Sequence, residues 1–211
     1  MTAVIFTWPP DYLMAALASR ALRRSGVRVV LAIDRKDPLP AVEGCEVVVT
    51  DFPRNGNLNG KECVEGILRT LEEQSRPEDP WVLKVDSDAL VTGVKWLEGR
   101  EEEAVGMFHP GHRGFFGFCY GIRRTALPGM RERAAQLKDD PGMYEDVTMG
   151  ELARPAHRYQ NLTEGCPMAA YGWKRQRTRD YWLTRYEIVV FQRVEGITRR
   201  NITEKMKEFL A

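Results

Sequence analysis

The strongest constraint on the fold comes from four short apolar segments in the first 90 residues. They span residues 3–6, 27–33, 46–50 and 81–85. Short runs of this kind are typical of strands that are covered on both faces. Two stretches with apolar residues at helical spacing, 11–24 and 61–73, lie between them, and Asp11 is the expected cap of the first. This order predicts an α/β fold, with a mostly parallel twisted sheet flanked by helices.

The regular pattern weakens beyond residue 88. Residues 106–121 are rich in Gly and in aromatic side chains, a composition typical of loops and edge strands. Further helices are expected over 128–137, 146–153 and 202–210, and a late strand over 186–192. Because the sequence shows no internal repeat and no low-complexity linker, we expect a single domain over residues 1–211.

Charge and cysteine content exclude several classes of protein. The 31 Lys and Arg residues balance 30 Asp and Glu residues, so the chain lacks the bulk positive charge of a nucleic-acid binder. No apolar run reaches the roughly 18 residues that a transmembrane helix needs, and residues 1–10 do not resemble a signal peptide. The four cysteines are widely spaced, without a CxxC pair. We therefore expect a cytoplasmic protein with reduced thiols.

Two aspartates follow the strand at 81–85 directly, in the order Asp86-Ser87-Asp88. In open parallel sheets, ligands bind beyond the carboxyl ends of the strands, so acids at a strand exit are candidate site residues. Asp86 and Asp88 straddle one residue and can face one side together, where they offer hard oxygen ligands to Mg²⁺ or Mn²⁺. The alternative is a pair of solvated turn residues that cap the next segment.

A second acidic pair, Glu145-Asp146, stands at the start of the helix expected over 146–153. Acids at this end of a helix also bind its free N–H groups, so capping alone is the simpler interpretation. The intervening segment 120–127 has the sequence Tyr-Gly-Ile-Arg-Arg-Thr-Ala-Leu. The two acidic motifs with this segment between them form a longer pattern.

That pattern resembles the glycosyltransferases of the A fold, above all the large family of small inverting enzymes that use nucleoside-diphosphate sugars. The resemblance covers about residues 3–153. Its specific parts are Asp34, residues 57–66, Asp86-Ser87-Asp88, residues 121–127 and Glu145-Asp146. It implies a hexosyltransferase-type enzyme with Mg²⁺ or Mn²⁺ as cofactor, and a nucleotide-sugar donor and an acceptor of unknown identity as partners. Residues 1–90 would form the nucleotide-binding half and residues 91–211 the acceptor side.

The resemblance also implies roles for single residues in the nucleotide-binding half. Thr7 and Trp8, after the first strand, and Asp34, at the end of the second, would hold the nucleoside. Asn57 and Lys61 belong to the matching segment 57–66 and would join the nucleotide site. These assignments come from the family and not from spacing alone.

For the reaction itself, the resemblance implies that Asp86 contacts the ribose or the metal and that Asp88 binds the metal. Asp146 would be the catalytic base, with Glu145 as its neighbour. A carboxylate at its ordinary pKa of about 4 is a weak base for an alcohol, so Asp146 must lie in a partly desolvated pocket that holds the acceptor.

Aromatic and His residues of the second half are candidates for acceptor binding, because sugars stack on such rings. His109 lies in the Gly-rich segment, and Trp173 follows Tyr171-Gly172. For Trp173 a place in the core is as good an interpretation, and His109 fits an exposed loop equally well.

Two departures from the family pattern and two rival functions remain. The last His is His157, so the carboxy-terminal His that serves many relatives as a metal ligand is absent. Gln176 and Arg179 match part of the Gln-x-x-Arg-Trp motif of processive synthases, but Asp180 replaces the Trp.

A sugar-nucleotide nucleotidyltransferase is one rival function, although Thr7-Trp8-Pro9-Pro10 is unlike the Gly-rich loop of those enzymes. A non-catalytic sugar-nucleotide-binding module is the other.

Overall fold

The computed structural model describes residues 1–54, 58–108, 114–140, 142–159, 166–173, 177–192 and 194–211. Four parallel strands lie in the order β3-β2-β1-β4. They are β1 (Thr2–Phe6), β2 (Arg28–Asp34), β3 (Glu46–Thr50) and β4 (Trp81–Val85). The predicted parallel core of an α/β fold is therefore confirmed, and its strand bounds differ from the expected ones by one residue at most.

The same sheet continues beyond β4 with three further strands, giving the full order β3-β2-β1-β4-β7-β6-β8. These are β6 (Ala104–Phe108), β7 (Phe115–Arg123) and β8 (Ala156–Tyr159). β7 runs antiparallel to both β4 and β6, whereas β8 is parallel to β6. The expectation of an edge strand at 106–121 was wrong, because β7 lies inside the sheet. The small Gly106 makes room there, since a Cβ on it would lie 2.6 Å from the ring of Phe115.

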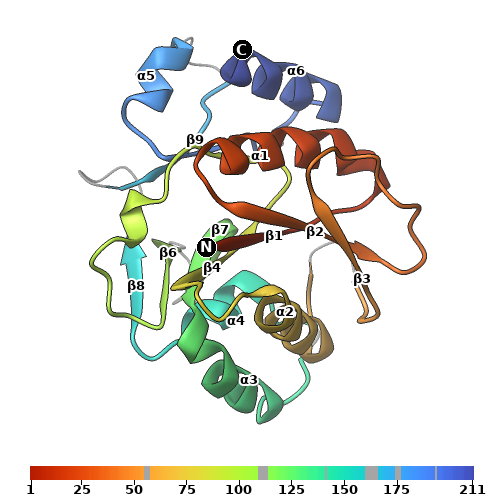
Figure 1. Ribbon diagram of the computed structural model, residues 1–211, viewed down its shortest axis with the longest axis vertical. Coiled ribbons are helices and arrows are strands. Elements are labelled where there is room, and N and C mark those ends of the chain that lie inside the picture. The colour runs from red at the N-terminus through yellow and green to blue at the C-terminus, as the bar shows by residue number, and fades with distance from the viewer. Residues whose placement is uncertain (55–57, 109–113, 141, 160–165, 174–176, 193) are drawn as a thin grey trace.

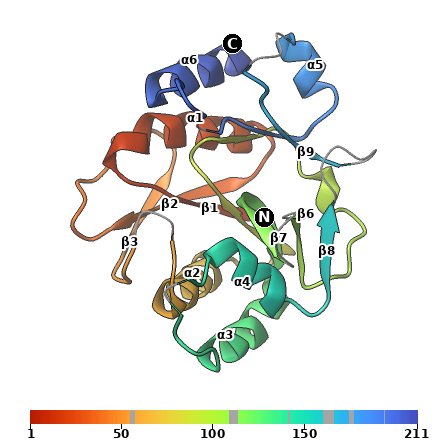
Figure 2. The ribbon, with the colours of Figure 1, turned by 180° about the vertical axis from the view of Figure 1, so that it is seen from behind.

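Helices cover both faces of the sheet (Figures 1 and 2). α2 (Lys61–Gln74), α3 (Leu127–Ala135) and α4 (Glu145–Leu152) pack on one face. The other face carries α1 (Tyr12–Arg24), α6 (Arg199–Leu210) and a small sheet of order β5-β10-β9. That sheet consists of β5 (Ala89–Val91), β10 (Ile188–Val190) and β9 (Met168–Ala170), with α5 (Arg179–Leu183) nearby. Elements as short as β5, β9 and α5 have no detectable periodicity, which is why the sequence did not predict them.

Alternation along the central strands divides the core into two halves. Ala3 and Ile5 belong to the cluster on the α1 side, and Val4 and Phe6 to the cluster on the α2 side. The same period of two directs Lys84 of β4 toward the α2 side, where its side chain is only 1% exposed. A lysine therefore occupies a core position near the carboxyl end of a central strand.

The segment after β1 differs from the expectation in one respect. Asp11 holds the position before α1, but its side chain makes no capping hydrogen bond. Its carboxylate instead pairs with Arg199 of α6 and accepts a hydrogen bond from the indole of Trp8. Asp11 therefore ties the turn after β1 to the carboxy-terminal helix.

Close backbone contact fixes the position of α4 against the start of β7. A Cβ on Gly150 of α4 would lie 2.7 Å from the Cα of Gly114, and a Cβ on Gly114 would lie 2.1 Å from the Cα of Val147. Only glycine permits this approach at either position. The helix that begins with Glu145 and Asp146 is thus held tightly against the strand that neighbours β4.

Two further expectations concern cysteines and membranes. The thiols of Cys45, Cys63, Cys119 and Cys166 are all free, and the last three cysteines are buried. Within the described residues, no helix is long and apolar enough to cross a membrane.

Replacing Gly150 with Ala should lower the free energy of unfolding by about 1–3 kcal/mol, because the added methyl group overlaps the backbone of Gly114. Urea denaturation measures the loss. Gly129→Ala in α3 is the matched control, since its Cβ would approach only the flexible end of Arg133 at 3.4 Å. That variant should gain up to about 1 kcal/mol. Equal stability of the two variants would show that α4 is free to move.

Candidate functional site

The segment after β4 is held between two strands, with its acids on the accessible side. The backbone N–H of Asp86 donates to the carbonyl of Phe118 (2.8 Å), and the N–H of Phe191 donates to the carbonyl of Asp88 (2.9 Å). The side chain of Asp86 is one-third exposed and Asp88 is partly exposed, whereas Ser87 between them is buried. The two carboxylates thus emerge at the carboxyl end of a central strand.

Behind these acids lies the buried ammonium group of Lys84. Its Nζ is 2.7 Å from Oδ1 of Asp86, 2.5 Å from the carbonyl oxygen of Gly117 and 3.4 Å from Oε1 of Glu145. Burial alone would lower the pKa of Lys84, but the charges of Asp86 and Glu145 raise it above its ordinary value. The lysine is therefore charged and joins β4, β7 and the start of α4.

Glu145 is buried, and its carboxylate is held from two sides. The hydroxyl of Tyr120 donates to Oε1 at 2.6 Å, and the ammonium of Lys84 faces the same oxygen. Burial raises the pKa of Glu145 to about 7, against the opposing effect of Lys84, and the charge of Asp86 adds to the rise. A carboxylate enclosed in this way is not available to a substrate.

Asp146 stands next in the chain but has a different environment. Its Oδ1 accepts the backbone N–H of Val147 (2.8 Å), and its Oδ2 lies only 3.1 Å from the point where a Cβ on Gly117 would stand. Within the described part of the chain, no Lys or Arg forms an ion pair with this partly exposed carboxylate. Its charge contributes to the raised pKa values of Asp86 and Glu145, whose first cause is burial. The charge of Asp146 thus acts on Asp86, so the fold brings the two carboxylates into one group.

Asp88 is the second acid at this edge, after Glu145, whose pKa is strongly raised. Burial and the charge of Asp86 raise the pKa of Asp88 to about 7. Asp11, from the turn after β1, adds to this rise, and Lys84 opposes it. Acids from three separate segments therefore repel one another here, as expected where a cation or a proton is normally bound.

The carboxyl ends of β1 and β2 form the adjoining part of the site. The hydroxyl of Thr7 is buried and finds no hydrogen-bond partner among the described residues. Asp34 receives hydrogen bonds from the backbone and side chain of Lys36, which lower its pKa against the opposing effect of burial. Trp8 is 49% exposed, with the guanidinium of Arg199 over its ring at 4.8 Å. These three predicted residues all lie at the same edge.

Arg54 is a site residue that the sequence analysis missed. Its guanidinium lies 5.3 Å from the ring centres of both Phe6 and Phe52. It donates to the carbonyls of Thr7 (3.2 Å) and Ala32 (3.0 Å), and so joins the ends of β1 and β2. Its burial lowers its pKa. Its only signal in the sequence is its position shortly after the third strand.

The remaining predicted residues are not brought into this group. The ammonium of Lys61 donates to the carbonyl of Ala135 at the end of α3 (2.7 Å). Trp173 donates its indole N–H to the carbonyl of Gln192 (3.1 Å) and packs edge-on against Tyr171, so it belongs to the small sheet. Asn57 and His109 lie outside the described residues. Among the aromatic residues of 106–121, Phe115 is fully buried.

The donor set at Asp86 and Asp88 fits a hard divalent cation only in part. Within the described ranges, no group of three His, Cys, Asp or Glu side chains could hold a metal ion. Two carboxylates suit Mg²⁺ or Mn²⁺ where phosphate and water oxygens fill the other positions, as Mg²⁺ commonly binds in proteins. Burial raises the pKa of Asp88, and repulsion by Asp86 adds to the rise; a cation would relieve that repulsion. The residues therefore fit a weakly held ion shared with a bound phosphate.

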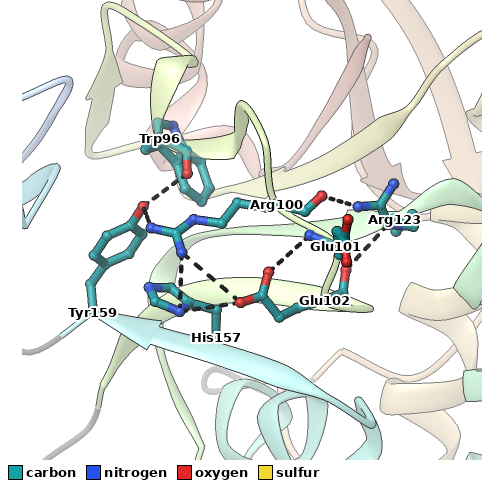
Figure 3. A network of polar contacts seen from close by, with 7 residues as sticks. All are labelled: Trp96, Arg100, Glu101, Glu102, Arg123, His157 and Tyr159. Atoms are coloured by element: carbon teal, nitrogen blue, oxygen red, sulfur yellow. Dashed lines mark hydrogen bonds and ion pairs between the residues drawn. The ribbon is translucent and has the colours of Figure 1, made fainter.

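A separate polar network lies along the β8 edge of the sheet, three strands away from β4 (Figure 3). Arg100 donates to the hydroxyl of Tyr159 (2.8 Å), and Glu102 faces Nδ1 of His157 at 3.4 Å. Burial and the charge of Arg100 lower the pKa of His157. His157 therefore serves the anchoring of β8 and cannot supply a ligand near Asp86.

A surface groove of about 710 Å³ also lies away from the acids. It runs between α2, α3 and the segment after β3, and neither Asp86, Asp88 nor Asp146 lines it. Ion pairs cross its surface, from Arg69 to Asp51 and from Arg131 to Glu72. The described acids that line it are not those with raised pKa values, so the strand ends remain the candidate site.

Comparison with solved structures shows that the fold is similar to those of glycosyltransferases. The chain matches an active-site mutant of LgtC with a TM-score of 0.57 and 11% identity, over 100% of this chain and 95% of that one. It matches the galactosyltransferase LgtC in complex with donor and acceptor sugar analogues with a TM-score of 0.56 and 11% identity, over 99% and 95%. It matches the glycosyltransferase GlyE of Streptococcus pneumoniae TIGR4 with a TM-score of 0.54 and 12% identity, over 97% and 59%. No protein-family model and no curated protein sequence matches.

In excess chelator, the free energy of unfolding should fall as pH rises from about 4 to 7. The pKa of Asp88 is about 7 in the folded protein, against an ordinary value of 3.8 that applies to the unfolded chain. Between these pH values the folded state binds more protons than the unfolded state, so the free energy of unfolding falls as the pH rises. Urea denaturation across this range gives the slope. Asp88→Asn should reduce the slope, although Glu145 contributes a part that remains. Ser87→Ala should leave it unchanged. An unchanged slope in Asp88→Asn would mean that its carboxyl is freely solvated.

Proposed function

We propose that this chain is a glycosyltransferase that moves a hexosyl group from a nucleoside-diphosphate sugar to an acceptor hydroxyl. One observation carries the proposal: the carboxylates of Asp86 and Asp88 emerge from a central strand beside Asp146. The likeness of the fold to a galactosyltransferase solved with donor and acceptor sugar analogues supports it. So does the position of the acids, at the strand ends where α/β sheets bind ligands.

Asp86 and Asp88 would hold Mg²⁺ or Mn²⁺ together with the diphosphate of the donor. When bound, such a cation would neutralise the negative charge that develops on the departing nucleoside diphosphate. Oδ1 of Asp86 is already engaged by Lys84, which leaves Oδ2 for the cation or the donor ribose. Asp88 has no ion-pair partner among the described side chains, so it is the better placed of the two to bind the cation.

The nucleoside would lie over the ends of β1 and β2. Thr7 contributes a buried hydroxyl that lacks a partner among the described residues, and Asp34 a carboxylate that its low pKa keeps ionised. Trp8 offers a half-exposed ring for stacking. Arg54 would keep the ends of β1 and β2 in register beneath the bound base.

Asp146 would accept the proton of the acceptor hydroxyl as that oxygen attacks the anomeric carbon. Its partly exposed carboxylate, with Oδ2 facing Gly117, is free of ion pairs within the described residues. Glu145, enclosed by Tyr120 and Lys84, is not free to do so. Attack by the acceptor in one step, with the base on the side opposite the leaving group, would invert the anomeric configuration.

Two other functions would use the same group of acids. A nucleotidyltransferase would release pyrophosphate from a nucleoside triphosphate and a sugar phosphate. A binding module would hold a sugar nucleotide without consuming it. The products of an incubation therefore separate all three.

The wild-type protein, incubated with uridine- and guanosine-diphosphate sugars and Mn²⁺, should release the nucleoside diphosphate, and faster with added sugar acceptors. Chelator should reduce this release strongly. Asp146→Asn should keep donor affinity and stability but lower turnover by a factor on the order of 10² or more, because Asn cannot accept the proton. Product assays by chromatography give the rates.

Asp139→Asn, an exposed acid in the loop after α3, is the matched control and should keep wild-type turnover. Turnover of Asp146→Asn within a few-fold of wild type would remove Asp146 from the mechanism. Release of pyrophosphate, or binding without any product, would contradict glycosyl transfer itself.

A further inference from the structure

A lysine at the core position of a central strand needs a specific explanation. Lys84 shares its face of β4 with Val82, which is fully buried among apolar side chains of the α2 side. Desolvating an ammonium group costs several kcal/mol unless its surroundings supply charged partners in good geometry. An apolar residue would satisfy the packing at this position without that cost. The lysine is therefore explained by what it contacts and not by the stability of the sheet.

The three oxygen partners of Lys84 come from three different elements. Asp86 follows β4, Gly117 lies within β7, and Glu145 begins α4. The ring of Tyr120, whose centre is 5.7 Å from Nζ, closes the remaining side and also binds Glu145. A single ammonium group thus fixes the exit of β4 relative to the start of α4.

The same contacts set the geometry of the two acids with proposed roles. The hydrogen bond to Oδ1 of Asp86 selects one orientation of that carboxylate. The contact with Glu145 holds the residue that immediately precedes Asp146, while the bond to the carbonyl of Gly117 holds the backbone that Asp146 faces. Both acids therefore take their positions from Lys84.

We propose that Lys84 is a positioning residue of the glycosyl-transfer site, which orients Asp86 and sets its separation from Asp146. This inference rests on the proposed function. Lys84 is only 1% exposed and does not reach substrate, so it acts through the two acids alone. By occupying one oxygen of Asp86, it also competes with a divalent cation for that carboxylate.

The rival explanation is that Lys84 only compensates buried negative charge. Removing the lysine alone would leave Glu145 without its cation, and Lys84→Met is expected to unfold or to be strongly destabilised for that reason alone. The double variant Lys84→Met/Glu145→Gln removes both charges together. The amide oxygen introduced at position 145 can still accept the hydroxyl of Tyr120, so the buried part of the pocket stays filled and uncharged, while the remaining charge of Asp86 is one-third exposed to solvent. If Lys84 only compensates charge, the double variant should keep the wild-type kcat and Mn²⁺ affinity. If Lys84 positions the acids, both quantities should change.

The double variant should melt close to the wild-type temperature. Its kcat for transfer should fall on the order of 10-fold or more, since misplacement of reacting groups by a fraction of an ångström is costly. Calorimetry should show Mn²⁺ binding about threefold tighter or more, because Asp86 has lost its competing partner. Arg133→Met/Glu103→Gln, which removes an ion pair between α3 and the segment before β6, is the matched control and should change neither quantity.

A double variant with wild-type stability whose kcat and Mn²⁺ affinity both stay within about twofold of wild type would overturn the inference. If the wild-type protein transfers no sugar from any donor, the proposed function fails, and the calorimetric comparison alone decides whether Lys84 engages Asp86. Unchanged Mn²⁺ affinity in that case also overturns the inference.

Discussion

The buried ammonium group of Lys84 is the contact on which the geometry of the acidic edge depends. It faces oxygens of Asp86, Gly117 and Glu145, and so connects β4, β7 and α4 where the side chains with proposed roles emerge. A charged pair in the core adds little stability compared with well-packed apolar groups, but it can impose one arrangement. Gly114 and Gly150 stabilise the same arrangement by packing, because only glycine lets α4 approach β7 so closely. Electrostatics and packing therefore fix the same distances.

The position of the other site residues follows from the topology of the sheet. The parallel strands β1, β2 and β4 are neighbours and end at one edge of the sheet, where they present Thr7, Asp34 and Asp86. Burial and mutual repulsion raise the pKa values of Asp88 and Glu145 to about 7. An edge so rich in acids is suited to a ligand that binds together with a cation, as a nucleoside diphosphate does. The likeness to glycosyltransferase structures concerns the fold, and the acids supply the argument for function.

Much of this could be predicted from the sequence, because the informative signals are local. Apolar runs separated by helical segments indicated the parallel strands, and acids at a strand exit indicated Asp86 and Asp88. The place of β7 inside the sheet could not be predicted, since its Gly and Phe pattern is also that of an edge strand. Arg54 and Lys84 escaped notice because their partners are set by tertiary contacts: Gly117 is 33 residues from Lys84. Asp11 has the position of a cap, yet Arg199, 188 residues away, takes its carboxylate.

The most direct test of the central claim is a crystal structure of the protein with Mn²⁺ and a nucleoside diphosphate, with anomalous diffraction recorded at the manganese edge. The account predicts one anomalous peak in contact with Asp88 and with oxygens of the diphosphate, next to Asp86. It also predicts the nucleoside over the ends of β1 and β2. A nucleotide in the groove between α2 and α3, or manganese bound without Asp88, would contradict it.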